Sequence, residues 1–365
     1  MHVDPGNYDF KGFCREICDS QAEAFSGYHY NQVKAFFYVA EEGWNPNFSD
    51  RFDTTNFGDI TRLTTQFENR KGAEERAVFF VGPYGEDDEL ISVLTAETEE
   101  AIKQVLLPAL NSRGDISPMP ILTEDFQRMN QIVLGEYPDM RVTEFKSERI
   151  PDLADAQVRP SVQRTVEYKG RDGREAAEEF KQRYGVVPVR VQYEKQDIEL
   201  RVDTSGKFTL KKVNQSNFNL LFEVIEEVVE SVLELKELTQ KIRFKQEEVN
   251  SGNLSISVPK IEAGEVDFDR EFTRVLAEDF VEGTRQNDRV DFSFTDVKME
   301  AGSLDFSAQV SDERRDSFFN ISATSDGLKI VPERGCSFPS LIEFYLCILQ
   351  TVDAGAEMDL YGAAA

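Results

Sequence analysis

Asp152, Glu167 and Lys169 have the residue types of a metal-dependent nuclease site. Asp152 follows a proline in a predicted loop, and Glu167 and Lys169 flank one residue at the predicted end of a strand. Carboxylates in such an arrangement hold Mg²⁺, and the lysine helps to polarise an attacking water. In so acidic a chain the same triplet arises by chance, as at Glu144 and Asp296. We therefore expect solvated charges at strand ends and keep the nuclease as an alternative hypothesis.

Cysteine and histidine offer little further chemistry. Cys14 and Cys18 lie four residues apart on the apolar side of a predicted helix, where a free cysteine behaves as a small buried hydrophobe. Both histidines, His2 and His29, precede position 30, and no nucleophile motif lies near either. The chain also lacks the glycine loops that bind phosphates or dinucleotides. We expect no metal, no cofactor and no catalytic residue set.

One segment is basic within an acidic chain. Between positions 181 and 213, eight lysines and arginines face only four carboxylates. Alternation with apolar residues predicts that the cations lie on the solvent side of a sheet. The predicted binding residues are Arg190, Arg201, Lys207, Lys211 and Lys212. Two interpretations remain open, namely neutralisation of nearby acidic helices and a docking surface for an acidic protein segment or a polyanion.

The charge of the whole chain indicates its habitat. Aspartate and glutamate number 68 against 41 lysines and arginines, which gives a net charge of −27. Such self-repulsion is tolerated where salt screens it, so we expect a halophilic, cytoplasmic protein of the haloarchaeal kind. An ordinary acidic protein is the alternative. No apolar run has the length of a membrane span, and the first residues lack the parts of a signal peptide. We expect no membrane association.

The elements that must position these residues centre on the segment 198–235. Its alternation predicts two strands around a turn at Gly206, followed by a long amphipathic helix that begins near Ser216. The segment 319–353 aligns with it without a gap and matches Gly206 with Gly327 and Ser216 with Ser337. We therefore predict an internal duplication with equivalent hairpin turns.

The predicted fold class is α+β, with tandem repeated β-β-α units, antiparallel sheets and helices packed on one face. We expect an N-terminal helical and irregular region (1–60), a β-β-α domain (61–135), two α+β repeats (136–250 and 251–353) and a flexible tail (354–365). A hairpin around the NSGN turn at 250–253 joins the repeats.

Function follows mainly from the lack of a catalytic set. The leading hypothesis is a non-catalytic interaction or scaffold protein that docks a protein partner through sheet surfaces. A nucleic-acid-binding protein that uses the basic sheet is the alternative, and a metal-dependent nuclease is the second alternative.

Overall fold

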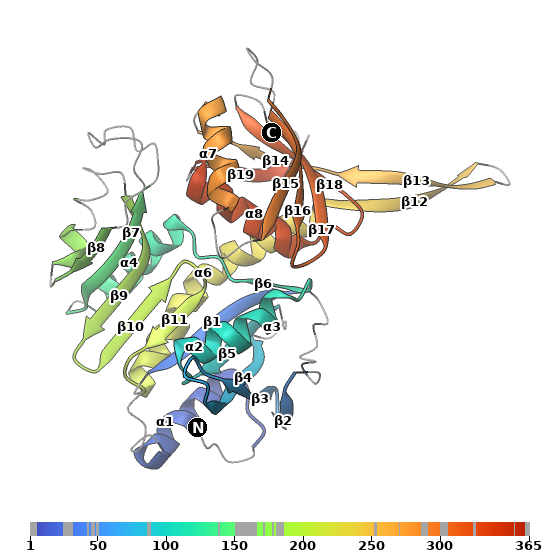
Figure 1. The fold of residues 1–365 in the computed structure, drawn as a ribbon. Helices are drawn as coiled ribbons and strands as arrows, with labels where there is room; N and C mark the ends of the chain where they lie inside the picture. Colours follow the sequence, from blue (N-terminus) through green and yellow to red (C-terminus); the bar gives the residue numbers. More distant parts are fainter. Residues whose placement is uncertain are drawn as a thin grey trace. The chain divides into compact units, whose positions relative to one another are not determined.

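The computed structural model describes residues 6–24, 32–41, 44, 48, 51–85, 89–137, 139–149, 166–170, 172–176, 179, 186–251, 254–269, 271–285, 291–299, 306–323, 326–353 and 355–361. The chain is a mixed α+β protein in which strands predominate (Figure 1). It divides into two compact units. Unit 1 comprises residues 1–149 and 153–233, and unit 2 comprises residues 150–152 and 234–365.

Unit 1 is built on one eleven-stranded sheet with the order β2-β3-β4-β5-β1-β11-β10-β9-β7-β8, in which β6 also pairs with β1. All its ladders between described strands are antiparallel. The strands are β1 (Val33–Ala40), β2 (Asp53–Phe57), β3 (Ile60–Glu68), β4 (Glu74–Tyr84), β5 (Leu90–Thr95), β6 (Ile116–Pro118), β7 (Arg141–Arg149), β8 (Val166–Lys169), β9 (Val186–Lys195), β10 (Ile198–Asp203) and β11 (Lys207–Leu210).

Strand β1 is the centre of this sheet, and all eight of its residues are buried. One of its edges pairs with β5, whereas the other is shared end to end by β11, along residues 33–36, and β6, along residues 38–40. An apolar run without alternation is compatible with a strand and with a short buried helix, and here it forms a strand. The apolar side chains on both faces require cover on both faces.

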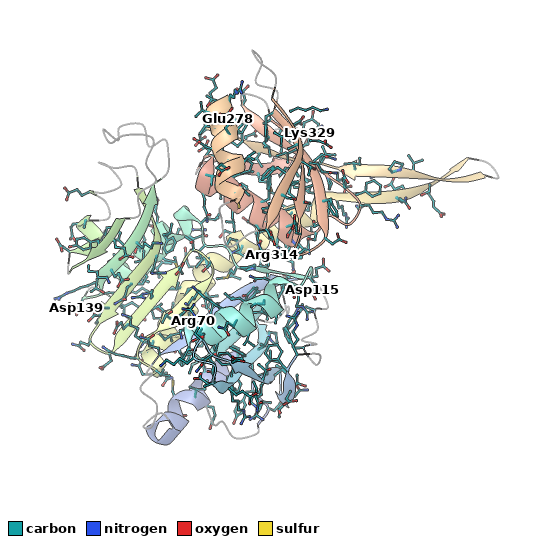
Figure 2. All side chains as sticks on the ribbon, viewed as in Figure 1. Arg70, Asp115, Asp139, Glu278, Arg314 and Lys329 are labelled. Atoms are coloured by element: carbon teal, nitrogen blue, oxygen red, sulfur yellow. The ribbon has the colours of Figure 1, made fainter. Side chains whose placement is uncertain are left out.

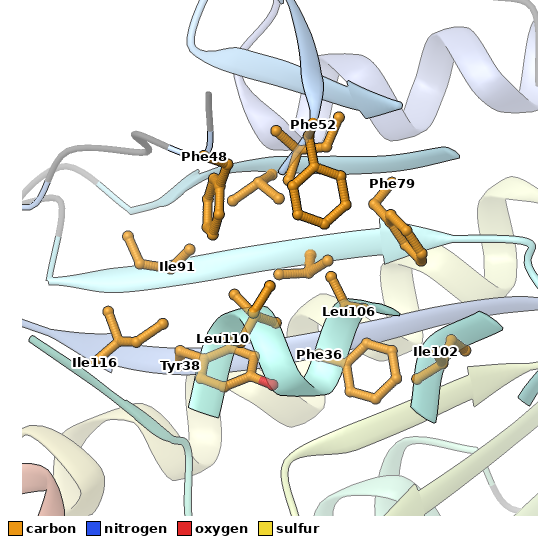
Figure 3. Packing of buried hydrophobic residues seen from close by; sticks show 14 of the residues in the cluster. Phe36, Tyr38, Phe48, Phe52, Phe79, Ile91, Ile102, Leu106, Leu110 and Ile116 are labelled. Atoms are coloured by element: carbon orange, nitrogen blue, oxygen red, sulfur yellow. The ribbon is translucent and has the colours of Figure 1, made fainter. Parts of the chain in front are cut away.

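Helices supply that cover from two sides. Phe36 and Tyr38 pack against Ile102, Leu106 and Leu110, which belong to η1 (Ile102–Leu106) and α3 (Leu107–Asn111) and follow the short α2 (Glu99–Ala101) (Figure 3). On the opposite face, Phe37 contacts Phe10 of α1 (Phe10–Ala24), whose ring also meets Phe222 of α6 (Gln215–Lys241). The expectation that helices pack on one face alone therefore does not hold around β1.

Helix α6 begins differently from the prediction. Asn214, not Ser216, is the capping residue, because its side-chain oxygen accepts the backbone N–H of Asn217 at 2.8 Å. The helix then buries an apolar stripe, as its 3.6-residue periodicity predicts, and Phe222 of this stripe contacts Phe10 of α1 and Tyr84 of β4. The stripe comprises Phe218, Leu221, Phe222, Ile225, Val228 and Val232.

Unit 2 contains a six-stranded sheet with the order β15-β16-β17-β18-β14-β19. Two helices, α7 (Arg274–Arg285) and α8 (Phe338–Thr351), meet its apolar side through Phe280 and Phe344, whose ring centroids lie 5.7 Å apart. The strands are β14 (Gly264–Asp267), β15 (Phe292–Met299), β16 (Phe306–Asp312), β17 (Ser317–Ala323), β18 (Gly327–Pro332) and β19 (Glu357–Leu360). A separate two-stranded sheet pairs β12 (Arg243–Ser251) with β13 (Leu254–Glu262), as the NSGN turn predicts.

The C-terminal segment differs from the expected flexible tail. Residues 357–360 form β19, which extends the sheet by pairing with β14, and the backbone N–H of Tyr361 donates to the carbonyl of Ala263 at 2.9 Å. Backbone hydrogen bonds at an open sheet edge hold this strand, and its alternation of polar and apolar residues spans only four positions.

The two segments compared in the sequence each form a hairpin followed by a helix: β10, β11 and α6 in one, β17, β18 and α8 in the other. Their glycines differ, however. Gly206 has a φ of +67°, and a Cβ there would lie 2.5 Å from the carbonyl oxygen of Met119. Gly327 is the first residue of β18 and lies outside the positive-φ region. The prediction of equivalent turn positions is therefore wrong for this pair.

Candidate functional site

Four of the five predicted binding residues, all except Lys212, lie on one face of the unit 1 sheet, which we call the polar face. Its central row runs across β1, β11, β10, β9 and β7, because directly paired residues point to the same side. That row consists of Lys34, Thr209, Arg201, Gln192 and Glu144. The opposite face carries the apolar side chains that pack toward α4 (Thr123–Glu136) and α6, and there the hydroxyl of Tyr193 donates to Asn130 of α4 at 2.7 Å.

Each predicted binding cation on the polar face has a partner. Arg201 lies 3.1 Å from Glu144 and also donates to the side-chain oxygen of Gln192 at 2.9 Å. In the flanking positions, the lysine and arginine nitrogens lie within 3.0 Å of a carboxylate oxygen. These pairs are Lys207 with Glu99, Lys211 with Glu199, and Arg190 with Asp203. The ammonium of Lys212 donates to the backbone carbonyl of Gln196.

Two of these carboxylates are distant in sequence from the basic segment, and sequence reasoning missed them. Glu99 comes from the start of α2 and Glu144 from β7. Strand order brings them to the cations, and no local pattern reports strand order. The result is a face of alternating charges with little net positive field, in place of the basic face that local counting predicts.

A buried lysine lies where the polar face meets α2. Lys34 donates to the carbonyl of Glu97, and its ammonium lies 3.9 Å from Glu99. Burial lowers the pKa of Lys34 and raises the pKa of Glu97, whose carboxylate also accepts the backbone N–H of Val78. Burial tends to raise the pKa of Glu99 as well, but the hydrogen bond and charge of Lys207 lower it overall. These groups hold the edge of the polar face in a fixed arrangement.

The nuclease candidates are only partly described. Asp152 lies outside the described residues. Glu167 and Lys169 belong to β8 and are exposed, opposite Lys146 and Glu144 of β7. The triplet at 167–169 therefore lies antiparallel to the triplet at 144–146, so that each glutamate faces a lysine. Cross-strand charge pairing explains this spacing, and within the described part of the chain no group of three His, Cys, Asp or Glu side chains is placed to hold a metal ion.

The cysteines have the surroundings of core residues. Cys14 and Cys347 are buried, and burial raises the pKa of Cys14 and brings that of Cys347 to about 12. Burial also raises the pKa of Cys18 to about 11. Thiols of this kind are poor nucleophiles and poor metal ligands near neutral pH, because the reactive form is the thiolate. His2 and His29 lie outside the described residues.

Unit 2 contains a buried ion cluster that the sequence did not indicate. The Arg315 side chain is 0% exposed, and its two terminal nitrogens lie 2.9 Å from Asp312 and 2.7 Å from Glu343. Ser340 donates to the same Asp312 oxygen at 2.7 Å. Arg314, which is labelled in Figure 2, pairs with Glu343 at 3.3 Å. Burial opposes the charge on Arg315, but both carboxylates raise its pKa overall. The cluster fastens the β16–β17 turn to α8.

The described helices include none that is long and apolar enough to cross a membrane. Fold and site thus define a mixed α+β protein with antiparallel sheets and a charge-paired sheet face. Residues 124–205, which include Glu144, Arg190 and Arg201 of that face, match the model of a family's middle domain (AF_0896_M). The chain is also 24% identical over 337 residues to an uncharacterized protein of Archaeoglobus fulgidus, and the match covers 89% of each chain.

Proposed function

We propose that this chain is a non-catalytic interaction protein of a salt-rich cytosol and that it docks a protein partner through the polar face. The observation that carries the proposal is the ordered lattice of paired charges, from Lys211 and Glu199 across to Arg201 and Glu144. Its side chains are held in position before any partner arrives, which lowers the entropic cost of binding.

The alternation of charge favours a protein over a nucleic acid. A polyanion gains affinity from cations that release counterions, and each cation here already faces a carboxylate or a carbonyl. A phosphate at Arg201 would have to displace Glu144 or lie beside it. A protein segment with both signs of charge can instead pair with each member of the lattice, which gives specificity more than raw affinity.

We also propose that the two hairpin-helix segments, 198–235 and 319–353, derive from one duplicated unit with its helix on one face. Their shared order of two strands followed by a helix supports this. Experimental coordinates test the idea directly, because superposition of the two hairpins must also superpose the first turns of their helices.

The partner test uses neutralising substitutions, since reversed charges would lie beside the native carboxylates. The test variant combines Arg201→Gln, Lys207→Gln and Lys211→Gln. The matched control is Arg70→Gln, Lys71→Gln and Arg76→Gln, at exposed positions of the same unit. Each is used as bait in the native lysate at about 2 M KCl, where weak surface attraction is screened. A protein that the control retains and the test variant loses supports the proposal, and capture of every protein by both baits refutes it.

The alternatives have their own measurements with the same proteins. Titration of a fluorescent DNA duplex between about 0.1 and 1 M KCl shows a steep salt slope if the cations bind phosphates, and the test variant lowers that slope. The nuclease hypothesis requires Mg²⁺-dependent cleavage that Asp152→Ala or Glu167→Ala abolishes. Docking of a protein predicts neither result.

A further inference from the structure

The two-stranded sheet of unit 2, which we call the arm, has no role in the proposed docking. It consists of β12 and β13 paired along their whole length, and it extends away from the six-stranded sheet (Figure 1). Its described side chains are mostly exposed, including Val258 at 42% and Ile261 at 48%. An isolated pair of strands is marginally stable in water, and among the described strands none pairs with an outer edge of the arm.

The two edges of the arm are not equivalent. Pro259 of β13 lies opposite Gln246 of β12. A proline is tolerated in a sheet where its missing N–H faces away from the neighbouring strand, so the donor is missing from the outer edge of β13. β12 has no proline, so none of its residues lacks a backbone N–H donor. Because the backbone direction alternates along a strand, the N–H and C=O groups of Phe244, Gln246 and Glu248 all point to that edge.

We propose that β12 pairs with β12 of a second copy of the chain, antiparallel, with Gln246 opposite Gln246. The two arms then form one four-stranded sheet with the order β13-β12-β12-β13, in which the last two strands belong to the second copy. In this register Lys245 of each copy lies opposite Glu247 of the other, and the two-fold axis makes the two contacts identical. Within each arm Lys245 already lies 3.1 Å from Glu262 and Glu247 lies 2.9 Å from Lys260, so the contacts across the axis extend these pairs into a network.

Charge singles out this register from its neighbours. A two-fold axis at Lys245 or at Glu247 places like charges opposite each other at the axis itself. An axis at Phe244 places Arg243 opposite Lys245, and an axis at Glu248 opposes two glutamates. Only the axis at Gln246 gives attraction without repulsion among these residues. A strand whose sequence complements itself in one register favours a second copy over an unrelated peptide as its occupant.

The test depends on that reciprocity. Lys245→Glu opposes two carboxylates at each of the two symmetric pairs, and Glu247→Lys opposes two ammonium groups there, so each variant alone should be a monomer. In an equimolar mixture, by contrast, a dimer of one chain of each variant restores opposite charges at both pairs.

In a dimer of the Lys245→Glu chain with the Glu247→Lys chain, position 245 of the first chain is acidic and lies opposite the introduced lysine of the second. The other pair joins the native Glu247 of the first chain to the native Lys245 of the second. Both pairs are therefore a glutamate and a lysine, and a heterodimer should form. Analytical ultracentrifugation of the full-length chains, from roughly 1 to 100 µM, suits the weak association expected of a short edge interface.

The expected results are a wild-type dimer, a monomer for each variant, and a dimer for the mixture. Asp279→Lys, an exposed reversal on α7, serves as the control and should remain a dimer. Circular dichroism checks that all variants are folded, as exposed positions allow. A monomeric wild type refutes the proposal, as does a variant that stays dimeric or a mixture that stays monomeric. Gln246→Pro removes a donor at the axis and should also abolish the dimer.

Discussion

The ion pair between Arg201 and Glu144 allows a quantitative test of the polar face. Its two side chains are 26% and 16% exposed, and their charged atoms lie 3.1 Å apart. At an effective dielectric constant of about 20, the attraction between unit charges at this distance is about 5 kcal/mol. Desolvation and lost side-chain freedom offset most of it, and hydrogen bonds to charged groups retain about 1.5–3 kcal/mol. We therefore expect a coupling of about 1.5 kcal/mol.

The perturbation is a double-mutant cycle with Arg201→Met, Glu144→Gln and the combined variant. Arg201→Met should lower the free energy of unfolding by about 2 kcal/mol, because it leaves Glu144 without a guanidinium. The combined variant should lose less than the sum of the two single losses. Urea unfolding at neutral pH measures all four proteins, and a repeat at molar KCl shows how far salt screens the pair.

A coupling below about 0.3 kcal/mol would show that the pair is only a surface contact. A matched cycle on the exposed pair Arg274–Glu278 of α7, whose side chains are 63% and 53% exposed, gives the value expected of such a contact. If both cycles give the same coupling, the polar face is no more ordered than the rest of the surface. The docking proposal then loses its support.

Four further outcomes are expected. Gly206→Val should lower the free energy of unfolding, measured by heat or urea, by about 2 kcal/mol or more, because the φ of Gly206 is positive and a Cβ there would contact the carbonyl of Met119. Gly114→Ala is the control and should be nearly neutral, because a Cβ at Gly114 has no atom within 4 Å. Arg315→Met should cost about 3–5 kcal/mol in urea unfolding, since it leaves the buried Asp312 without this guanidinium and Glu343 with Arg314 as its remaining ion-pair partner, and a loss below about 1 kcal/mol would contradict that account. Cys18 should alkylate slowly at pH 8, because a pKa raised to about 11 leaves roughly 0.1% of the thiol as thiolate. The thiolate fraction, and with it the alkylation rate, rises only as the pH approaches that pKa. A rate equal to that of the urea-unfolded chain would refute the raised pKa. The melting temperature should rise as KCl increases from about 0.1 M towards molar concentrations, and a flat or falling curve would remove the support for a salt-rich habitat.

Local features of the fold were predictable from local patterns. Alternation along 198–210 gives β10 and β11 with their turn, and the NSGN turn gives the hairpin of β12 and β13. These features depend on residues a few positions apart, where periodicity and turn chemistry act directly. The same alternation correctly places Arg201 opposite the apolar side of its strand.

The partners of the polar face were not predictable in this way. Alternation assigns Arg201 to a face, but it does not say which strand lies beside β9, and therefore does not identify Glu144. The two triplets at 144–146 and 167–169 looked like accidents of composition until pairing of β7 with β8 placed them side by side. Likewise, Asn214 caps α6, whereas the sequence pattern predicted a helix start near Ser216.

The shared edge of β1 has a consequence for synthesis of the chain on the ribosome. β5 and β6 follow β1 within about 80 residues, but β11 emerges about 170 residues after it. At typical translation rates of 5–20 residues per second, residues 33–36 wait roughly 10–30 s for their hydrogen-bond partner. During that interval the nascent chain presents a short, apolar, unpaired strand edge. Slow translation or early release between β6 and β11 should therefore favour aggregation of the truncated chain, even though β1 to β6 have already been synthesised.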